Sequence, residues 1–256
     1  MTGGRYVAIG SSMAAGPGIQ PRAPESPRLA MRSARNYPHL LARDLGLDLV
    51  DVTYSGATTA HVLTDEQNGV PPQVQALDGT EELVTVTIGG NDIGYVPALM
   101  AATLPRATRL LPVVGGGLRE LLDPDARERA LGAVGASLVA VGTAIREAAP
   151  EARVLFVEYL TLLPPASQKA RPLRAAYADL GRHLADRLVE LTAEAAAATG
   201  CEVVPVAEAS REHHAWSAEP WTVGAALPIP RRPMPYHPNA AGMRAVAALV
   251  REHLAH

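Results

Sequence analysis

Four short segments of the chain carry groups that could take part in acyl transfer: Gly10-Ser11-Ser12, Ser55-Gly56-Ala57, Gly90-Asn91-Asp92 and His237. A serine hydroxyl becomes an effective nucleophile when a nearby base takes its proton. The tetrahedral intermediate that follows needs hydrogen-bond donors at the oxygen where negative charge develops. A serine, a histidine, an asparagine amide and a glycine N–H that no side chain obstructs would together supply these groups.

Each segment also has an ordinary structural explanation when it is considered alone. Glycine, serine, asparagine and aspartate are typical of turns after strands. A histidine followed by Pro238 could be a solvated residue before a helix that begins with proline. A phosphate-binding loop is disfavoured, because the Gly-x-x-x-x-Gly-Lys-Ser/Thr pattern is absent and no lysine lies near Ser12. The significance of the four segments therefore depends on whether the fold brings them together.

The alternation of apolar runs with helical patterns predicts where the four segments lie. Strands are expected at residues 5–9, 47–52, 83–88, 153–158 and 202–206, and helices at 37–45, 72–77, 124–149, 172–199 and 238–254. This order is typical of an α/β fold with a parallel sheet covered on both faces. Three segments follow the first three strands and His237 precedes the last helix. All four should therefore meet at the carboxyl edge of the sheet, where such folds bind ligands.

Three longer stretches, residues 16–35, 94–123 and 207–236, do not match regular elements. Each follows a predicted strand, so they are candidates for the walls of a pocket or for a lid. The middle stretch is apolar and contains Gly115-Gly116-Gly117, which could act as a hinge. A helix that caps the core explains the same stretch equally well.

Composition limits the kind of protein and its partners. A chain of 256 residues, 48% of them hydrophobic, suits one large α/β domain. The 23 basic and 26 acidic residues nearly cancel, so the overall charge does not suggest binding to nucleic acid or to an anionic membrane. We expect a small-molecule ester as the partner, and the sequence leaves the oligomeric state open.

Cysteine content and hydropathy bear on location. The single cysteine, Cys201, excludes an internal disulfide framework and favours a reducing compartment, so we expect a cytoplasmic protein. No apolar run approaches the roughly 18 residues of a membrane span, and the first residues lack the pattern of a signal peptide. A secreted form that has lost its signal stays open as an alternative.

Taken together, the four segments resemble the four sequence blocks of the SGNH, or GDSL-like, hydrolase superfamily of serine esterases and lipases. The resemblance extends over residues 7–245. It implies that Ser12 is the nucleophile and His237 the general base. It also implies an oxyanion hole made of the Ser12 N–H, the Gly56 N–H and the side-chain amide of Asn91.

The same resemblance has consequences for the fold and for cofactors. It implies a flavodoxin-like three-layer α/β/α sandwich with a five-stranded parallel sheet, formed by a single SGNH hydrolase domain over residues 1–256. No cofactor or metal is implied. Two adjacent histidines, His213 and His214, could belong to a metal site, but solvated loop residues are the better interpretation because adjacent side chains diverge.

The first block departs from the family pattern at the residue before the nucleophile. An aspartate usually stands there, whereas this chain has Ser11. Two adjacent hydroxyls make Ser11 the rival nucleophile. Ser12 is preferred because its distance from Gly10 matches the family serine. Asp92, which follows Asn91, is expected to be a structural hydrogen-bond acceptor.

The last block departs at the residue that usually orients the histidine. The family has aspartate three residues before the histidine, and this chain has Met234. Either a glutamate from the preceding loop or a main-chain carbonyl must then accept the Nδ1–H of His237. We expect the carbonyl of Met234, which would make this chain similar to actinobacterial-type relatives that work as a Ser-His dyad. The glutamates that stay open as alternatives are Glu208, Glu212 and Glu219.

These expectations predict a cofactor-independent carboxylic-ester hydrolase that acts on short or medium acyl esters through an acyl-enzyme. An acyltransferase or deacylase would use the same acyl-enzyme on a specific metabolite. A non-catalytic binding module is a third hypothesis, which the presence of all four block residues disfavours.

Overall fold

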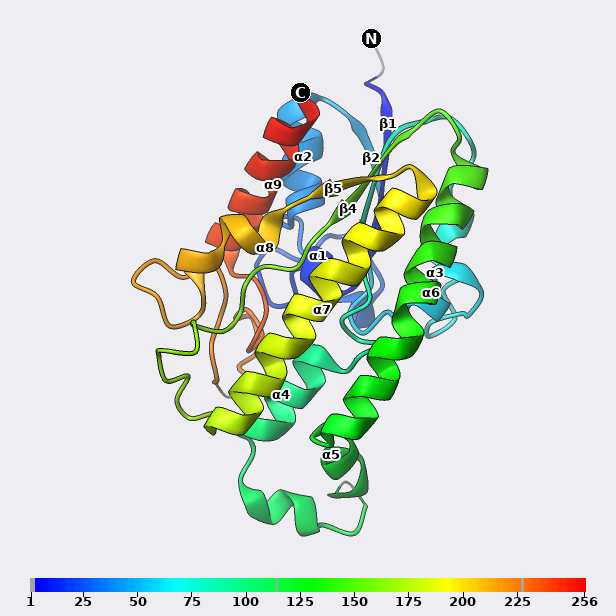
Figure 1. Ribbon diagram of the computed structural model, residues 1–256. Helices are drawn as coiled ribbons and strands as arrows, with labels where there is room; N and C mark the ends of the chain where they lie inside the picture. The colour runs from blue at the N-terminus through cyan, green and yellow to red at the C-terminus, as the bar shows by residue number, and fades with distance from the viewer. Residues whose placement is uncertain (1–2, 114, 227) are drawn as a thin grey trace.

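Five strands form one parallel sheet with the order β2-β1-β3-β4-β5 (Figure 1). The computed structural model describes residues 3–113, 115–226 and 228–256. The strands are β1 (Arg5–Gly10), β2 (Asp48–Asp51), β3 (Glu81–Thr87), β4 (Arg153–Val157) and β5 (Glu202–Val204). All five predicted strands are confirmed, each to within two residues at its ends.

Helices cover both faces of this sheet, so the predicted three-layer sandwich is confirmed (Figure 1). The helices α2 (Tyr37–Leu45) and α9 (Ala240–Leu254) pack together on one face. On the other face lie α3 (Thr59–Leu63), α6 (Pro124–Ala148) and α7 (Ala175–Thr199). Strand β1 lies between β2 and β3, and its side chains alternate between the two cores as the period of a strand requires. Tyr6 and Ala8 belong to one core, and Val7 and Ile9 to the other.

Asparagine side chains cap the starts of α2 and α9. The Asn36 side chain accepts the His39 N–H at the start of α2. The Asn239 side chain accepts two main-chain N–H groups at the start of α9. An asparagine at this position satisfies donors that have no partner within the helix. Because Asn239 is the cap, α9 begins at Ala240 rather than at residue 238, and His237 lies just outside the helix.

The stretch 94–123 is mostly helical. It contains α4 (Tyr95–Thr103), a 3₁₀ turn (Arg106–Leu110) and α5 (Gly115–Leu121), with residue 114 outside the described residues. The three glycines form the first turn of α5, which packs beside α4, and this arrangement gives the hinge interpretation no support. The alternative of a helical segment is confirmed for this stretch.

The other two stretches consist mainly of loops with short helical turns. Residues 16–35 contain a 3₁₀ turn (Arg28–Ala30). Residues 207–236, of which 227 lies outside the described residues, include most of α8 (Val206–Ala209) and a second 3₁₀ turn (Arg211–His213). The segment that follows β1 directly is α1 (Ser12–Ala15).

Among the described helices, α6 is long and apolar enough to cross a membrane by length and composition alone. This is weak evidence for a span, since a core helix of a soluble protein passes the same test. Residues along α6 such as Leu131, Leu138 and Ile145 pack in the core beneath the sheet.

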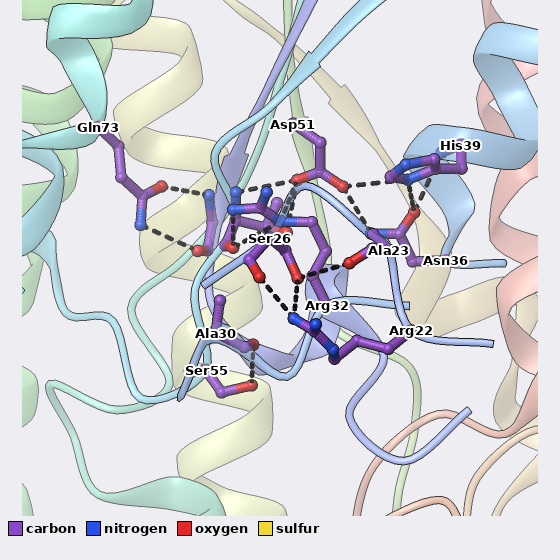
Figure 2. A network of polar contacts seen from close by, with 12 residues as sticks. Arg22, Ala23, Ser26, Ala30, Arg32, Asn36, His39, Asp51, Ser55 and Gln73 are labelled. Atoms are coloured by element: carbon purple, nitrogen blue, oxygen red, sulfur yellow. Dashed lines mark hydrogen bonds and ion pairs between the residues drawn. The ribbon is translucent and has the colours of Figure 1, made fainter. Parts of the chain in front are cut away.

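An ionic network holds the stretch 16–35 against the end of β2 (Figure 2). The buried carboxylate of Asp51 accepts a hydrogen bond from Asn36 at 2.7 Å and lies 3.2 Å from the Arg32 Nε. Burial raises the pKa of Asp51, but hydrogen bonding to His39 and the charge of Arg32 outweigh it and hold the pKa below its ordinary value. The Asp51 carboxylate therefore stays charged and fixes this loop.

A side-chain amide extends the sheet past the end of β2. Oε1 of Gln73, in a 3₁₀ turn (Gln73–Ala76), accepts the Gly10 N–H at 2.7 Å, and Nε2 donates to the Gly10 carbonyl at 3.1 Å (Figure 2). Gly10 has φ +152°, and a Cβ there would lie 2.6 Å from the Thr87 carbonyl. Gln73 thus pairs with a strand end that only glycine fits, two residues before Ser12.

We expect Gln73→Ala to lower the free energy of unfolding by about 1–3 kcal/mol, because it leaves the buried Gly10 N–H without an acceptor. The Gly10 carbonyl still accepts the Tyr54 N–H. Urea unfolding measures the change. Gln75→Ala in the same turn is the matched control, since the Gln75 side chain is exposed. Equal stability of the two variants would contradict this assignment.

Candidate active site

The fold brings Ser12 and His237 within hydrogen-bond distance. Ser12 is the first residue of α1 and lies two residues after the end of β1, whereas His237 lies two residues before Asn239, the cap of α9. The Ser12 Oγ and His237 Nε2 atoms are 2.8 Å apart. Both residues are buried, with exposures of 7% and 4%. This is the geometry that a serine nucleophile and its base require.

A main-chain carbonyl orients the imidazole. The Nδ1 atom of His237 lies 2.8 Å from the carbonyl oxygen of Pro235. A carbonyl can only accept, so Nδ1 carries the proton and Nε2 is free to accept from the serine.

The prediction that Met234 supplies this carbonyl is wrong by one residue. The Met234 carbonyl accepts the main-chain N–H of His237 at 3.2 Å, in a turn in which Tyr236 has φ +58°. The turn uses that oxygen and leaves the Pro235 carbonyl facing the ring. A main-chain acceptor was expected, and the structure moves it to the next residue.

The three glutamates that stayed open as alternatives do not reach the ring. Glu208, Glu212 and Glu219 are exposed, and Glu208 forms an ion pair with Arg211. Within the described residues no carboxylate contacts the His237 ring. The arrangement is therefore a Ser-His pair with a neutral orienting group.

Burial determines the charge of the imidazole. It lowers the pKa of His237 to about 4, and the hydrogen bond to the Pro235 carbonyl offsets only part of this effect. At neutral pH the ring is uncharged, as a group that must accept a proton has to be.

The Gly56 and Asn91 loops lie side by side at the same edge. The side-chain amide of Asn91 donates to the Ala57 carbonyl at 2.8 Å. Asp92 accepts from the N–H and the hydroxyl of Thr59, at 3.0 and 2.5 Å, which confirms its structural role. The loop after β3 is thereby joined to the loop after β2.

Several donors at this edge are available to a ligand. The N–H groups of Ser12 and Gly56 make no hydrogen bond within the described part of the chain. Gly56 has φ +82°, a conformation that favours glycine, and the residue is exposed. The Asn91 amide has a second N–H besides the one that binds Ala57. These groups fit the expected oxyanion hole.

Tyr159 is a residue of the site that the sequence analysis missed. Its hydroxyl accepts the Gly90 N–H at 3.2 Å and lies 2.8 Å from the Ser11 Oγ. Since a phenol has one hydrogen, it can donate that hydrogen to Ser11 while it accepts from Gly90. Tyr159 thus joins the neighbour of Ser12 to the neighbour of Asn91.

This contact also defines what Ser11 does. Ser11 is fully buried and its hydroxyl bonds to Tyr159, whereas the Ser12 hydroxyl bonds to the imidazole. Tyr159 lies two residues beyond the end of β4, at the same edge as the other site residues. A polar side chain just after the end of a predicted strand could therefore have identified Tyr159 from the sequence.

A cavity of about 730 Å³ is lined in part by Tyr159. Residues of β3, β4 and α7 line it, together with the loop 158–165, and Ser12 and His237 do not. This cavity therefore adjoins the site without taking in the reacting atoms.

Side chains suited to bind a metal do not cluster in the described ranges of the chain. His213 stacks on Trp221, with ring centroids 4.0 Å apart, and its Nδ1 contacts the Glu219 carbonyl. His214 Nδ1 accepts the Trp216 N–H. Both histidines thus have structural contacts within their own loop.

Comparison with known proteins places this chain among lipases and acylhydrolases. Residues 8–245 match the model of a family described as the GDSL-like Lipase/Acylhydrolase family. The chain is 33% identical over 261 residues to Lipase 2 of Streptomyces coelicolor, an alignment that covers 94% of this chain and 83% of that protein. It is 28% identical over 238 residues to a lipase of Streptomyces rimosus, an alignment that covers 93% of this chain and 81% of that protein.

Two solved structures share the fold over nearly the whole chain. Phospholipase A1 from Streptomyces albidoflavus NA297 superposes with a TM-score of 0.80 at 23% identity, covering 98% of this chain and 99% of that one. An extracellular lipase from Streptomyces rimosus superposes with a TM-score of 0.77 at 26% identity, covering 97% of this chain and 99% of that one.

The low pKa of His237 predicts the acidic limb of the pH profile. For a water-soluble ester, kcat/KM should fall with a midpoint near pH 4 rather than near 6.5, because only the neutral imidazole accepts the serine proton. Initial rates between pH 3 and 8 measure this. Each sample is also assayed after return to pH 7, which separates titration from unfolding. A reversible midpoint near 6.5 would contradict the burial argument.

We expect Tyr159→Phe to lower kcat by roughly tenfold with little change in KM, because small displacements of reacting groups are costly. The phenyl ring would still pack against Gly90, so the fold is retained. Tyr95→Phe is the control: Tyr95 is buried, and its hydroxyl contacts neither Ser11 nor Gly90. Equal kcat for the wild type and Tyr159→Phe would show that the hydroxyl does not position the site.

Proposed function

Because this chain belongs to the GDSL-like Lipase/Acylhydrolase family and is a serine ester hydrolase, we propose that Ser12 and His237 carry out its reaction. The observation that supports this most directly is the 2.8 Å contact between Ser12 Oγ and His237 Nε2. Ser11, the rival, bonds to Tyr159 instead.

The proposed reaction follows the usual order of acyl-enzyme chemistry. His237 Nε2 takes the hydroxyl proton as Ser12 Oγ attacks the ester carbonyl, and the resulting oxyanion accepts from the Ser12, Gly56 and Asn91 donors. Collapse of the intermediate breaks the bond to the alcohol, which leaves with the proton from His237. Water, deprotonated by His237, then attacks the acyl-enzyme and releases the acid.

A neutral orienting group has a consequence for the rate. The Pro235 carbonyl holds the ring in the correct tautomer, but it stabilises the imidazolium of the transition state less than a carboxylate would. We therefore expect a lower turnover than in relatives with a carboxylate at this position.

The proposed substrates are carboxylic esters with short or medium acyl groups. The relatives named lipase and phospholipase A1 support extending this class to lipid esters. They favour hydrolysis over acyl transfer to a specific metabolite, because each name describes a hydrolase. We also propose that the chain forms one hydrolase domain, since the family match extends over residues 8–245.

The cytoplasmic location that the single cysteine suggested finds no support among the relatives. The Streptomyces rimosus lipase structure is described as that of an extracellular enzyme. We therefore propose that this protein also acts outside the cell.

Labelling with a fluorophosphonate probe, followed by peptide mass spectrometry, tests the nucleophile. The wild type and Ser11→Ala should both carry the probe on Ser12, and Ser12→Ala should not react, because only the Ser12 hydroxyl contacts the base. Ser11→Ala is thus the matched control. Labelling that persists in Ser12→Ala would overturn the assignment, and an unreactive wild type would revive the binding-module hypothesis.

A further inference from the structure

Exposed apolar side chains gather in three loops at the carboxyl edge of the sheet. In the described part of the chain, seven of the eight large hydrophobic side chains with high exposure lie in residues 16–35, 104–113 and 228–236. The eighth, Leu45, ends α2 near the opposite edge. Exposure reaches 82% at Leu110 and 94% at Val113. The seven are Leu29, Met31, Leu104, Leu110, Leu111, Val113 and Ile229.

Main-chain and side-chain contacts join the three loops around the site. The Met234 N–H donates to the Pro17 carbonyl at 3.2 Å, which ties the first loop to the third. The Tyr236 hydroxyl lies 2.6 Å from the Thr103 hydroxyl, at the residue before the second loop begins. Tyr236 precedes His237 directly. These contacts join the three loops close to His237, and the segment 104–113 forms the end of the molecule opposite both termini (Figure 1).

The same loops carry a local positive charge. They contain eight arginines and one glutamate, although the whole chain has 23 basic and 26 acidic residues. Six of these arginines are exposed and form no ion pair within the described residues: Arg22, Arg28, Arg35, Arg106, Arg231 and Arg232. The overall charge balance, which suggested no anionic surface as a partner, thus conceals a basic face.

The first loop is held rigidly, so its exposed side chains do not reflect disorder. Leu29 and Met31 flank Ala30, which is fully buried and whose carbonyl accepts from the Ser55 hydroxyl at 2.8 Å (Figure 2). Arg32 is fixed by Asp51 and by the Thr53 carbonyl. The fold therefore presents these apolar side chains to the outside.

We propose that these three loops, termed the Arg-Leu rim, form a docking surface for an anionic lipid bilayer. Contiguous exposed apolar side chains mark interaction sites. Here they project from separate loop ends, and a fluid surface can accommodate such projections without a complementary shape. Leucines inserted at the boundary of headgroups and acyl chains add apolar burial, and arginines bind lipid phosphates. The inference goes beyond the proposed function, since docking requires no hydrolysis.

Vesicle sedimentation tests the proposal. The probes are vesicles of ether-linked phosphatidylglycerol and of ether-linked phosphatidylcholine, whose alkyl chains carry no ester bond. The wild type should bind the anionic vesicles, less so at high salt, and should bind the zwitterionic vesicles weakly. Arg231→Gln with Arg232→Gln should weaken binding roughly 30-fold, from the usual contribution of a basic residue near an anionic surface. Leu110→Ser with Val113→Ser should weaken it roughly tenfold or more.

Matched controls lie away from the rim. Leu45→Ser replaces the exposed leucine near the opposite edge, and Arg43→Gln with Arg251→Gln removes two arginines that lie beside Asp44. These controls should bind like the wild type, and all variants should hydrolyse a water-soluble short ester at the wild-type rate. Equal binding to both vesicle types would overturn the proposal. The proposal would also be overturned if Leu110→Ser with Val113→Ser left vesicle binding unchanged and the protein bound heparin as tightly as it bound the vesicles. That result would indicate general attraction to polyanions.

Discussion

The hydrogen bond between Ser12 and His237 is the contact on which the rest of the structure depends, because it joins two residues 225 positions apart. One partner is placed by the end of the inner strand β1, where Gln73 pairs with Gly10. The other is placed by the start of α9, where the Asn239 side chain caps the helix. The sheet and its two helical layers keep these two chain segments together. A displacement of either would separate the proposed nucleophile from its base.

Burial gives the imidazole its character and also limits it. A fully buried ring without a carboxylate partner is held neutral, which suits a base at ordinary pH. The same burial disfavours the imidazolium that forms during attack, and the Pro235 carbonyl compensates for only part of this. Tyr159 and Asp92 contribute differently, since they hold the loops that carry the proposed oxyanion donors and have no contact with the ring.

The sequence was sufficient for the strands and the edge where the site lies, because apolar periodicity follows from burial and strand order follows from βα alternation. It could not decide between the Met234 and Pro235 carbonyls, which are both close to His237 in the chain. The outcome depends on a turn in which Tyr236 has positive φ, a conformation that residue type does not predict. Gly115 to Gly117 suggested a hinge, yet they form the first turn of α5, which packs beside α4. The net charge of the chain sums over all residues, so it did not indicate the Arg-Leu rim. The rim forms only when the fold brings together three loops that are distant in the sequence.

The most direct test of the account is a crystal structure of the enzyme inactivated by a fluorophosphonate. We expect a covalent bond from phosphorus to Ser12 Oγ. We also expect the phosphonyl oxygen to lie within hydrogen-bond distance of the Ser12 and Gly56 N–H groups and the Asn91 amide, with His237 Nδ1 still donating to the Pro235 carbonyl. An adduct on Ser11, or a phosphonyl oxygen directed away from Gly56 and Asn91, would contradict it.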